Sequence, residues 1–266
     1  MHSPISVTIL TKNSQKHLPG ILDRLSAFDE ILILDSGSED ATLSLVTNYA
    51  NVSLYQDRFT GFGEMHNKAT ALARNDWILS IDSDEVPSEE LLTELATLQL
   101  DAGCVYTIPR RNIYNGKVIK HCGWWPDRVK RLYNRTATQW SDAEVHESVL
   151  TAGMRIIDLQ HPLIHYSYEG IGHFLSKMQS YSDLFVKQNK DKKAASPCKA
   201  VLHGLAAFIK TYFIKRGFLD GWEGLIISSY NANTAFYKYL KLYEANCSQR
   251  NAAYMDSTPS KVPFHR

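Results

Sequence analysis

The feature of this sequence that most constrains its fold is a regular alternation of strand-like and helix-like segments over its first ninety residues. Four short runs rich in β-branched and aliphatic residues begin at Ile5 (ISVTIL), Glu30 (EILILD), Val52 (VSLYQD) and Trp77 (WILSID). The segments between them place apolar residues at a helical period. Strands that alternate with helices form a parallel sheet covered by helices. The sequence therefore predicts an α/β fold with a Rossmann-like, mostly parallel sheet.

Polar residues follow each of these four runs. They are Thr11 and Asn13 after the first run, Asp35 after the second, Asp57 after the third, and Asp82 and Asp84 after the fourth. Open sheets of this kind bind ligands in the crevice beyond the carboxyl ends of their strands. We therefore expect these side chains to converge on one crevice.

The fourth run ends in a cluster of three acids, Asp82, Asp84 and Glu85, within the stretch WILSIDSDEVP. Adjacent carboxylates repel one another, so such a cluster is tolerated at a strand end when a cation compensates it. Hard carboxylate oxygens suit Mg²⁺ or Mn²⁺, which usually keep water or substrate phosphate as their other ligands. The alternative is a solvated turn that caps a helix beginning at Ser88, whose hydroxyl can accept a backbone N–H.

Four stretches of the chain resemble successive motifs of family 2 glycosyltransferases with the GT-A fold. They are ISVTILTKN, EILILDSGSEDAT, GFGEMHNKATALARNDWILSIDSDE, and GWWPDRVKRLYNR with the later VHE. More narrowly, the chain resembles bacterial enzymes that add glucose, as β-1,4-glucosyltransferases, to the inner core of lipopolysaccharide or lipooligosaccharide. The resemblance covers roughly residues 4 to 245. It implies a GT-A fold, a UDP-sugar donor and a Mg²⁺ or Mn²⁺ cofactor.

The resemblance also implies residues for the donor and the metal. The residues expected to bind the nucleotide sugar are Thr11, Asn13, Asp35, Asp57, Gly63, His66, Asn67, Asp82 and Ser83, and the expected metal ligands are Asp82, Asp84 and His165. The family usually has an arginine before the asparagine of the third helix, whereas this chain has His66 before Asn67. We expect His66 to donate to the diphosphate, or Lys68 to supply the missing charge; an inert histidine on the helix surface is the alternative.

Sugar transfer needs a general base for the acceptor hydroxyl, and the family places an acid after the core of the sheet. The matching stretch here is SDAEVHES, in which Glu147 is the expected base, Glu144 the alternative and His146 a neighbour in the same motif. The loop GWWPDRVKRLYNR combines stacking surfaces with fixed charge. The residues expected there to bind the acceptor are Trp124, Trp125, Asp127, Arg128 and Arg131.

The bulk composition restricts the partners and the compartment. A net charge of +1 gives no general attraction to nucleic acid, so no nucleic-acid partner is expected. The four cysteines are scattered, which suits a reducing cytoplasm, and no leader segment or membrane span is evident. Near residues 199–216 an amphipathic helix carries an apolar arc with basic residues, a composition suited to the headgroup layer of a membrane. We expect a cytoplasmic enzyme that is peripheral on the inner membrane and meets a lipid-linked oligosaccharide there.

The sequence therefore suggests three parts. Residues 1–190 form the catalytic domain, with a nucleotide-sugar half to about residue 100 and an acceptor half to about 190; residues 191–245 form the amphipathic helical region, and 246–266 a disordered tail. The expected reaction is inverting transfer of a hexose, glucose from UDP-glucose, to a heptose of the core. Two alternatives remain open: a haloacid-dehalogenase-like phosphatase that uses the D-x-D-x-V pattern at Asp82, and a non-catalytic carbohydrate-binding protein at the membrane surface.

Overall fold

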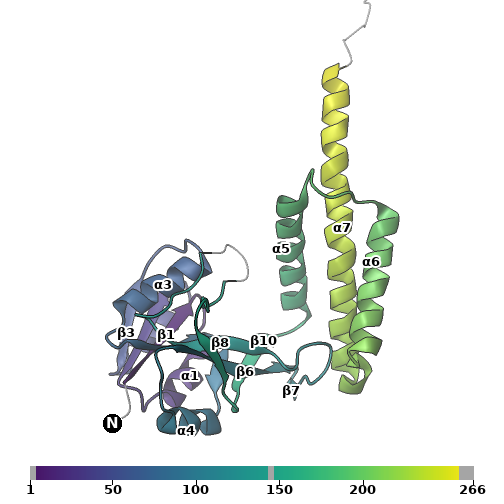
Figure 1. The fold of residues 1–266 in the computed structure, drawn as a ribbon. Helices are drawn as coiled ribbons and strands as arrows, with labels where there is room; N and C mark the ends of the chain where they lie inside the picture. Colours follow the sequence, from purple (N-terminus) through teal and green to yellow (C-terminus); the bar gives the residue numbers. More distant parts are fainter. Residues whose placement is uncertain (1–3, 143–146, 258–266) are drawn as a thin grey trace, which may run out of the picture. The chain divides into compact units, whose positions relative to one another are not determined.

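The structure is a computed structural model, and it describes residues 4–142 and 147–257. The described chain divides into two compact units (Figure 1). Residues 4–113 and 126–167 form the sheet unit, and residues 114–125 and 168–257 form the helical unit. The division therefore differs from the expected boundary at residue 190, because the helix that precedes residue 190 packs with the helices that follow it.

The sheet unit contains the alternating elements that the sequence predicts. They are β1 Ile5–Thr11, α1 Leu18–Arg24, β2 Glu30–Asp35, α2 Thr42–Val46, β3 Val52–Gln56, α3 Phe62–Leu72, β4 Trp77–Asp82, β5 Glu85–Pro87, α4 Glu89–Thr97, β6 Cys104–Tyr114, β8 Arg128–Asn134, β9 Arg155–Asp158 and β10 Leu163–Tyr168. The N-terminus of α4 is capped as expected, since the Ser88 hydroxyl accepts the N–H of Leu91 at 3.1 Å.

The strand order across the sheet is β3-β2-β1-β4-β8-β6-β10-β5. The first four strands are parallel, and β8 then pairs antiparallel with both β4 and β6. The register aligns Thr11 with Asp35 and Leu10 with Asp82. The polar residues at these strand ends therefore lie at one edge of the sheet, as the sequence predicts.

Helices cover both faces of the parallel half of the sheet. On β2, Ile31 and Ile33 face the core that includes residues of α1 and α4, whereas Leu32 and Leu34 pack with residues of α3. Successive side chains of a strand point to opposite faces, so a strand buried on both faces reads as a continuous apolar run. This arrangement explains why EILILD has no polar position between Glu30 and Asp35.

The helical unit is built on one long helix. Its elements are β7 Lys117–Val118, α5 Ile171–Asn189, α6 Pro197–Ile209, the π-helical turn η1 Lys210–Ile214, the 3₁₀ turn η2 Gly217–Asp220 and α7 Trp222–Ser257. Both α5 and α6 pack against α7 (Figure 1). The expected irregular tail from residue 246 is helical through Ser257, as a continuation of α7. None of the described helices combines the length and the apolar character needed to cross a membrane.

Candidate active site

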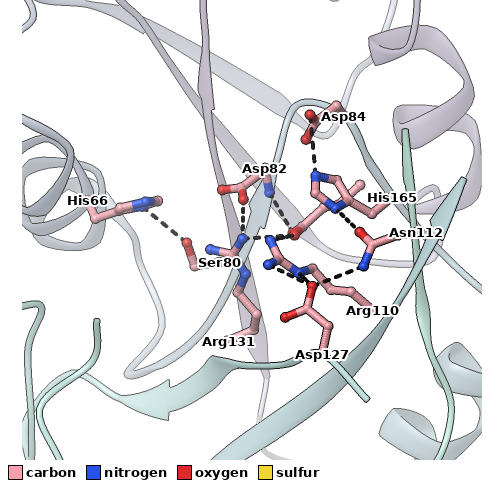
Figure 2. Close-up of polar contacts among 10 residues, drawn as sticks. His66, Ser80, Asp82, Asp84, Arg110, Asn112, Asp127, Arg131 and His165 are labelled. Atoms are coloured by element: carbon pink, nitrogen blue, oxygen red, sulfur yellow. Dashed lines mark hydrogen bonds and ion pairs between the residues drawn. The ribbon is translucent and has the colours of Figure 1, made fainter. Parts of the chain in front are cut away.

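An ion pair lies at the carboxyl end of β4. Arg131, on the neighbouring strand β8, donates through Nη2 to Asp82 Oδ2 and, at 2.9 Å, to Glu85 Oε1 (Figure 2). The backbone N–H of Asp82 donates to Glu85 Oε2 at 3.1 Å. The charge that compensates two members of the acidic cluster is therefore a buried guanidinium supplied by the protein itself.

Burial and neighbouring charges act in opposite directions on the pKa of the Asp82 carboxyl. Burial alone raises the pKa of the Asp82 carboxyl, but Arg131, assisted by His66, outweighs it and lowers the pKa of Asp82 to about 2. Glu85 has no exposed surface, and its burial, with the neighbouring Asp82 charge, raises the pKa of its carboxyl. Asp82 keeps 37% of its side-chain surface exposed, so its ionised carboxylate remains open to a ligand.

The third acid of the cluster, Asp84, has a different partner. Its Oδ2 lies 3.5 Å from Nε2 of His165 on β10. The His165 Nδ1 lies 2.6 Å from Asn112 Oδ1, and the amide nitrogen of Asn112 donates to Asp127 at 3.1 Å (Figure 2). Because Asn112 donates to Asp127, its oxygen must accept from Nδ1–H of His165, which assigns the tautomer and leaves Nε2 facing Asp84. A second residue that fixes a histidine in this way is typical of metal sites.

The residues at this position fit a divalent cation that shares its coordination with a ligand. Two neighbouring ligands on an octahedral ion with bonds of about 2.1 Å lie about 3.0 Å apart, close to the Asp84 to His165 separation. Within the described residues, no group of three or more His, Cys, Asp or Glu side chains is gathered closely enough to hold a metal alone. An ion at Asp84 and His165 would therefore need further ligands from substrate or water.

The strand ends at β1 and β2 are joined by hydrogen bonds. The Asp35 carboxylate accepts the N–H groups of Gly37 and Ser38, each at 2.9 Å, and the Ser38 hydroxyl. Asn13, in the left-handed backbone region, accepts the N–H of Glu39 through Oδ1 at 2.8 Å. These contacts shape the two loops, and the expected contacts of Asp35 and Asn13 with a nucleotide stay a prediction. The buried hydroxyl of Thr11 has no hydrogen-bond partner among the described residues.

Asp57 and Ser83 also lie near this edge. Asp57 donates its N–H to the Asp35 carbonyl at 3.0 Å, and Lys68 Nζ lies 3.0 Å from its carboxylate and 3.3 Å from Glu64. The hydrogen bond from Lys68 lowers the pKa of Asp57. Lys68 is thus paired with two acids, and the expectation that it supplies the charge of the missing arginine stays a prediction. The Ser83 hydroxyl accepts from Ser14 at 2.9 Å.

Three further residues expected at the nucleotide sugar contact protein instead. A side chain at Gly63 would overlap the carbonyl oxygen of Ser141, so glycine is needed here for close packing, and its expected contact with the nucleotide sugar stays a prediction. His66 is buried and stacks on Trp140, which corrects the alternative of a surface histidine. Asn67 binds both backbone polar groups of Trp140. Burial lowers the pKa of His66 to about 4, so its ring is neutral near pH 7 and does not supply the expected positive charge.

The expected base lies between β8 and β9, where residues 139–142 run antiparallel to residues 147–150; we call these two described stretches the hairpin. Glu147 is partly exposed and directly precedes Ser148, whose carbonyl accepts the N–H of Ser141 at 3.0 Å. Trp140 and Val149 form the bridge at the base of this hairpin. Glu144 and His146, the other two residues of the expected catalytic motif, lie outside the described residues.

The five residues expected to bind the acceptor are divided between the two units. Trp124 and Trp125 belong to the helical unit, whereas the other three belong to the sheet unit. Arg128 donates to the Leu159 carbonyl at 2.9 Å, and Asp127 accepts from Arg110 at 2.9 Å. Arg131 is buried against Asp82 and Glu85, and the expectation that it binds the acceptor stays a prediction.

Sequence reasoning missed the polar residues of β6. Arg110 and Asn112 both contact Asp127, and Arg110 also lies 3.3 Å from Glu85. The signal for them is present in CVYTIPRRNIY, where two polar residues two positions apart interrupt one face of an otherwise apolar strand. Tyr133 and Trp140 carried no such signal, because buried aromatic residues occur in any core.

Comparisons with known proteins identify chains that are similar to this one. The sequence model described as Glycosyl transferase family 2 matches residues 6–156. An uncharacterized glycosyltransferase of Rickettsia typhi is 26% identical over 267 residues, covering 95% of this chain and 91% of its own length. The lipopolysaccharide core biosynthesis glycosyltransferase LpsC of Rhizobium meliloti is 25% identical and covers 91% of this chain and 92% of its own length. A mannosyltransferase from Pyrobaculum calidifontis, solved with GDP-mannose and Mn²⁺, is 17% identical, covers 94% of this chain and 88% of its own, and has a TM-score of 0.52.

Proposed function

Because the chain belongs to glycosyl transferase family 2, we propose that it transfers a hexose from a UDP-sugar, with inversion and with a divalent metal, to a lipid-linked oligosaccharide. The family membership, the GT-A fold and the glycosyltransferase class expected from the sequence are confirmed. The observation that carries the metal-dependent mechanism is the Asp84 and His165 pair, held by Asn112 at the end of the parallel sheet. The donor, acceptor and stereochemistry are part of the proposal.

In the proposed mechanism, Asp84 and His165 hold Mg²⁺ or Mn²⁺; whether Asp82 adds a third ligand stays a prediction. When bound, such an ion would supply positive charge against the negative charge that develops on the departing diphosphate. Asn112 accepts from Nδ1–H of His165 and so holds the ring with Nε2 directed toward Asp84. Arg131 keeps Asp82 ionised, so that this carboxylate accepts hydrogen bonds from the sugar nucleotide.

Glu147 is proposed to act as the general base. It takes the proton of the acceptor hydroxyl while that oxygen attacks the anomeric carbon, and the bonding electrons of the breaking carbon–oxygen bond leave with the diphosphate. Attack opposite the leaving group inverts the anomeric centre and gives a β linkage from an α-linked donor. Thr11, Asn13, Asp35 and Asp57 lie at the strand ends where nucleotides bind in open α/β sheets.

Glucose and a core heptose are proposed as the donor sugar and the acceptor. The support is the similarity to the lipopolysaccharide core enzyme of Rhizobium meliloti, which extends over nearly the full length of both chains. The phosphatase alternative is not supported, because the acidic strand β4 belongs to a family 2 glycosyltransferase domain and pairs Asp82 with a buried arginine. The non-catalytic alternative leaves the Asp84 and His165 pair without a role.

Transfer assays with a panel of nucleotide sugars and Mn²⁺ or Mg²⁺ test this function. We expect UDP-glucose to be consumed with a core oligosaccharide acceptor, and Glu147→Gln to lower kcat by about 10²–10⁴-fold while donor affinity, measured by calorimetry, stays unchanged. An equally active Glu147→Gln variant would move the base elsewhere. Absence of turnover and binding with every nucleotide sugar would contradict the proposed donor class.

A membrane surface is the proposed site of this reaction, and α6 gives the support. This helix turns its small residues Ala200 and Gly204 toward α7: a side chain at Gly204 would lie 3.2 Å from Phe236. His203 stacks on Tyr239 of α7 at 4.0 Å, so the more polar face is the packed one. The large apolar residues of α6 are therefore exposed.

The exposed apolar surface continues beyond α6 through η1 and η2. We call it the apolar ridge, and it consists of Val201, Leu202, Leu205, Ile209, Phe213, Ile214, Phe218, Leu219 and Trp222. Leu202, Ile214 and Trp222 are 66%, 73% and 76% exposed. Exposed cations accompany the ridge at Lys210, Lys215 and Arg216, whereas the acid within residues 197–222, Asp220, is buried. An apolar surface bordered by cations complements an anionic lipid layer. The protein is proposed to bind the cytoplasmic face of the inner membrane through this ridge.

Vesicle sedimentation tests the apolar ridge. The protein is expected to sediment with vesicles of phosphatidylcholine mixed with phosphatidylglycerol, and more weakly with phosphatidylcholine alone. Replacing Ile214, Phe218 and Trp222 together by Gln should weaken binding by about 100-fold or more, since each buried apolar side chain contributes about 1 kcal/mol or more. Ile156→Gln, at an exposed apolar residue of the sheet unit, is the matched control. Unchanged sedimentation of the triple variant would contradict a lipid partner. So would a wild-type protein that is a dimer and that the triple substitution converts to a monomer.

A further inference from the structure

One face of α3 holds the hairpin that carries Glu147. Gly63, His66, Asn67 and Thr70 are spaced so that they lie along one side of a helix. Three of them contact Trp140 or Ser141, at the base of the hairpin, and Thr70 contacts Tyr133, which in turn binds Trp140. The hairpin therefore packs on this side of α3, and we call this surface of the helix the seat.

Asn67 fixes the backbone of the hairpin at one residue. Its Oδ1 accepts the N–H of Trp140 at 2.9 Å, and its Nδ2 donates to the Trp140 carbonyl at 3.1 Å. One amide thus satisfies both polar backbone groups of Trp140, and it does so in one orientation. Gly63 lets Ser141 approach the helix so closely that any larger residue would push the hairpin away.

The side chain of Trp140 is fixed as well. It stacks on the His66 ring, with centroids 3.9 Å apart and planes 12° from parallel, and it donates Nε1–H to the Tyr133 hydroxyl at 2.9 Å. The Tyr133 hydroxyl lies 2.7 Å from that of Thr70, which donates to the His66 carbonyl at 2.8 Å. Each group in this chain of hydrogen bonds, from Trp140 through Tyr133 and Thr70 to the His66 carbonyl, can donate to the next. Every polar group of the chain is therefore satisfied.

The same residues touch the strand that carries the acidic cluster. His66 Nδ1 lies 3.2 Å from the hydroxyl of Ser80 on β4, two positions before Asp82 (Figure 2). Arg131, the ion-pair partner of Asp82, lies with its guanidinium carbon 6.0 Å from the centre of the Trp140 ring. The end of β4 and the base of the hairpin thus share their packing partners.

We propose that Asn67 and His66 are positioning residues that set the distance between the Glu147 hairpin and the donor site at Asp82. The hydrogen bonds between Ser141 and Ser148 transmit this placement to Glu147, which immediately precedes Ser148 in the chain. The inference rests on the proposed function, because it assigns Glu147 the role of base. It gives a reason for the departure from the family motif, since a neutral, flat ring at position 66 stacks on Trp140.

Asn67→Ala tests the proposal with two independent measurements. Hydrogen exchange of the Trp140 and Ser141 amides should accelerate, because the two hydrogen bonds between the Asn67 side chain and the Trp140 backbone are lost. In transfer assays kcat should fall by about 10²-fold with the donor KM within about twofold, since misplacement of a catalytic group by about 1 Å costs this much. Asn51→Ala is the matched control, because it removes a similar amide to carbonyl bond, to Phe28 at 2.9 Å, at the far end of the sheet.

The His66 stack is tested by a conservative pair of variants. His66→Phe keeps a flat ring against Trp140 and should retain most of the kcat of the wild type. His66→Ala removes the ring, so its kcat should fall by about 10²-fold, as in Asn67→Ala. Unchanged amide exchange in Asn67→Ala would contradict the seat, and faster exchange with unchanged kcat would contradict the positioning role. If the wild-type protein transfers no sugar, the proposed function fails, whereas amide exchange still tests the seat.

Discussion

Replacing Asp84 by Ala is expected to lower kcat for sugar transfer by at least about 10²–10³-fold, because the variant loses a carboxylate that holds the metal at the departing diphosphate. The free energy of unfolding should change little. The Asp84 side chain is 36% exposed, and its ion pair with His165, at 3.5 Å, contributes at most about 1 kcal/mol. The backbone carbonyl of Asp84, which accepts the Tyr166 N–H at 3.0 Å, is unaffected.

Steady-state kinetics over a range of Mn²⁺ concentrations, with urea unfolding of the same samples, provide the measurement. Asp76→Ala is the matched control, because Asp76 is an exposed acid paired with Arg135 immediately before β4. We expect that variant to keep full activity. If Asp84→Ala kept full, metal-dependent activity, Asp84 would not be a metal ligand, and the proposed mechanism would be contradicted.

Arg131→Met is expected to lower the free energy of unfolding by about 3–5 kcal/mol, because it leaves two carboxylates at a buried site without their common cation. Methionine approximates the length and volume of the arginine stem, so loss of charge and not of packing should dominate. Urea unfolding measures the effect. Arg155→Met, at an exposed pair with Asp101, should cost at most about 1 kcal/mol.

The pH dependence of Arg131→Met identifies the cause. The folded pKa of Glu85 is already raised above its usual 4.5 by burial, and loss of Arg131 should raise it further. A carboxyl with a raised folded pKa binds its proton more tightly in the native state, so its stabilising contribution is present below pH 4.5 and is lost as pH rises through the folded pKa. The difference in the free energy of unfolding between wild type and Arg131→Met should therefore shrink as pH falls from about 7 to about 5. Adding Glu85→Gln should restore part of the stability at neutral pH, and a deficit independent of both changes would contradict the charge explanation.

The sequence by itself determined the elements that local chemistry specifies. The four strands of the parallel half, the capped start of α4 and the gathering of Thr11, Asp35 and Asp82 at one edge follow from apolar periodicity, from a serine cap and from the parallel register. The same patterns could not predict which partner each polar side chain takes. Asp82 and Arg131 are 49 positions apart, and nothing in the spacing distinguishes a protein guanidinium from a metal as the compensating cation.

The tertiary structure alone decided the roles of residues whose sequence context is ambiguous. Gly63, His66 and Asn67 form a motif that resembles a donor-binding helix, yet folding places this face against Trp140, more than seventy positions away. The apolar side of α6 is exposed, and its side with small residues is packed against α7. Helical periodicity cannot predict this orientation, because it shows which residues share a face of the helix but not whether that face is buried or exposed. Local sequence fixes backbone conformation over a few residues, whereas burial and pairing depend on which distant segments the fold brings together.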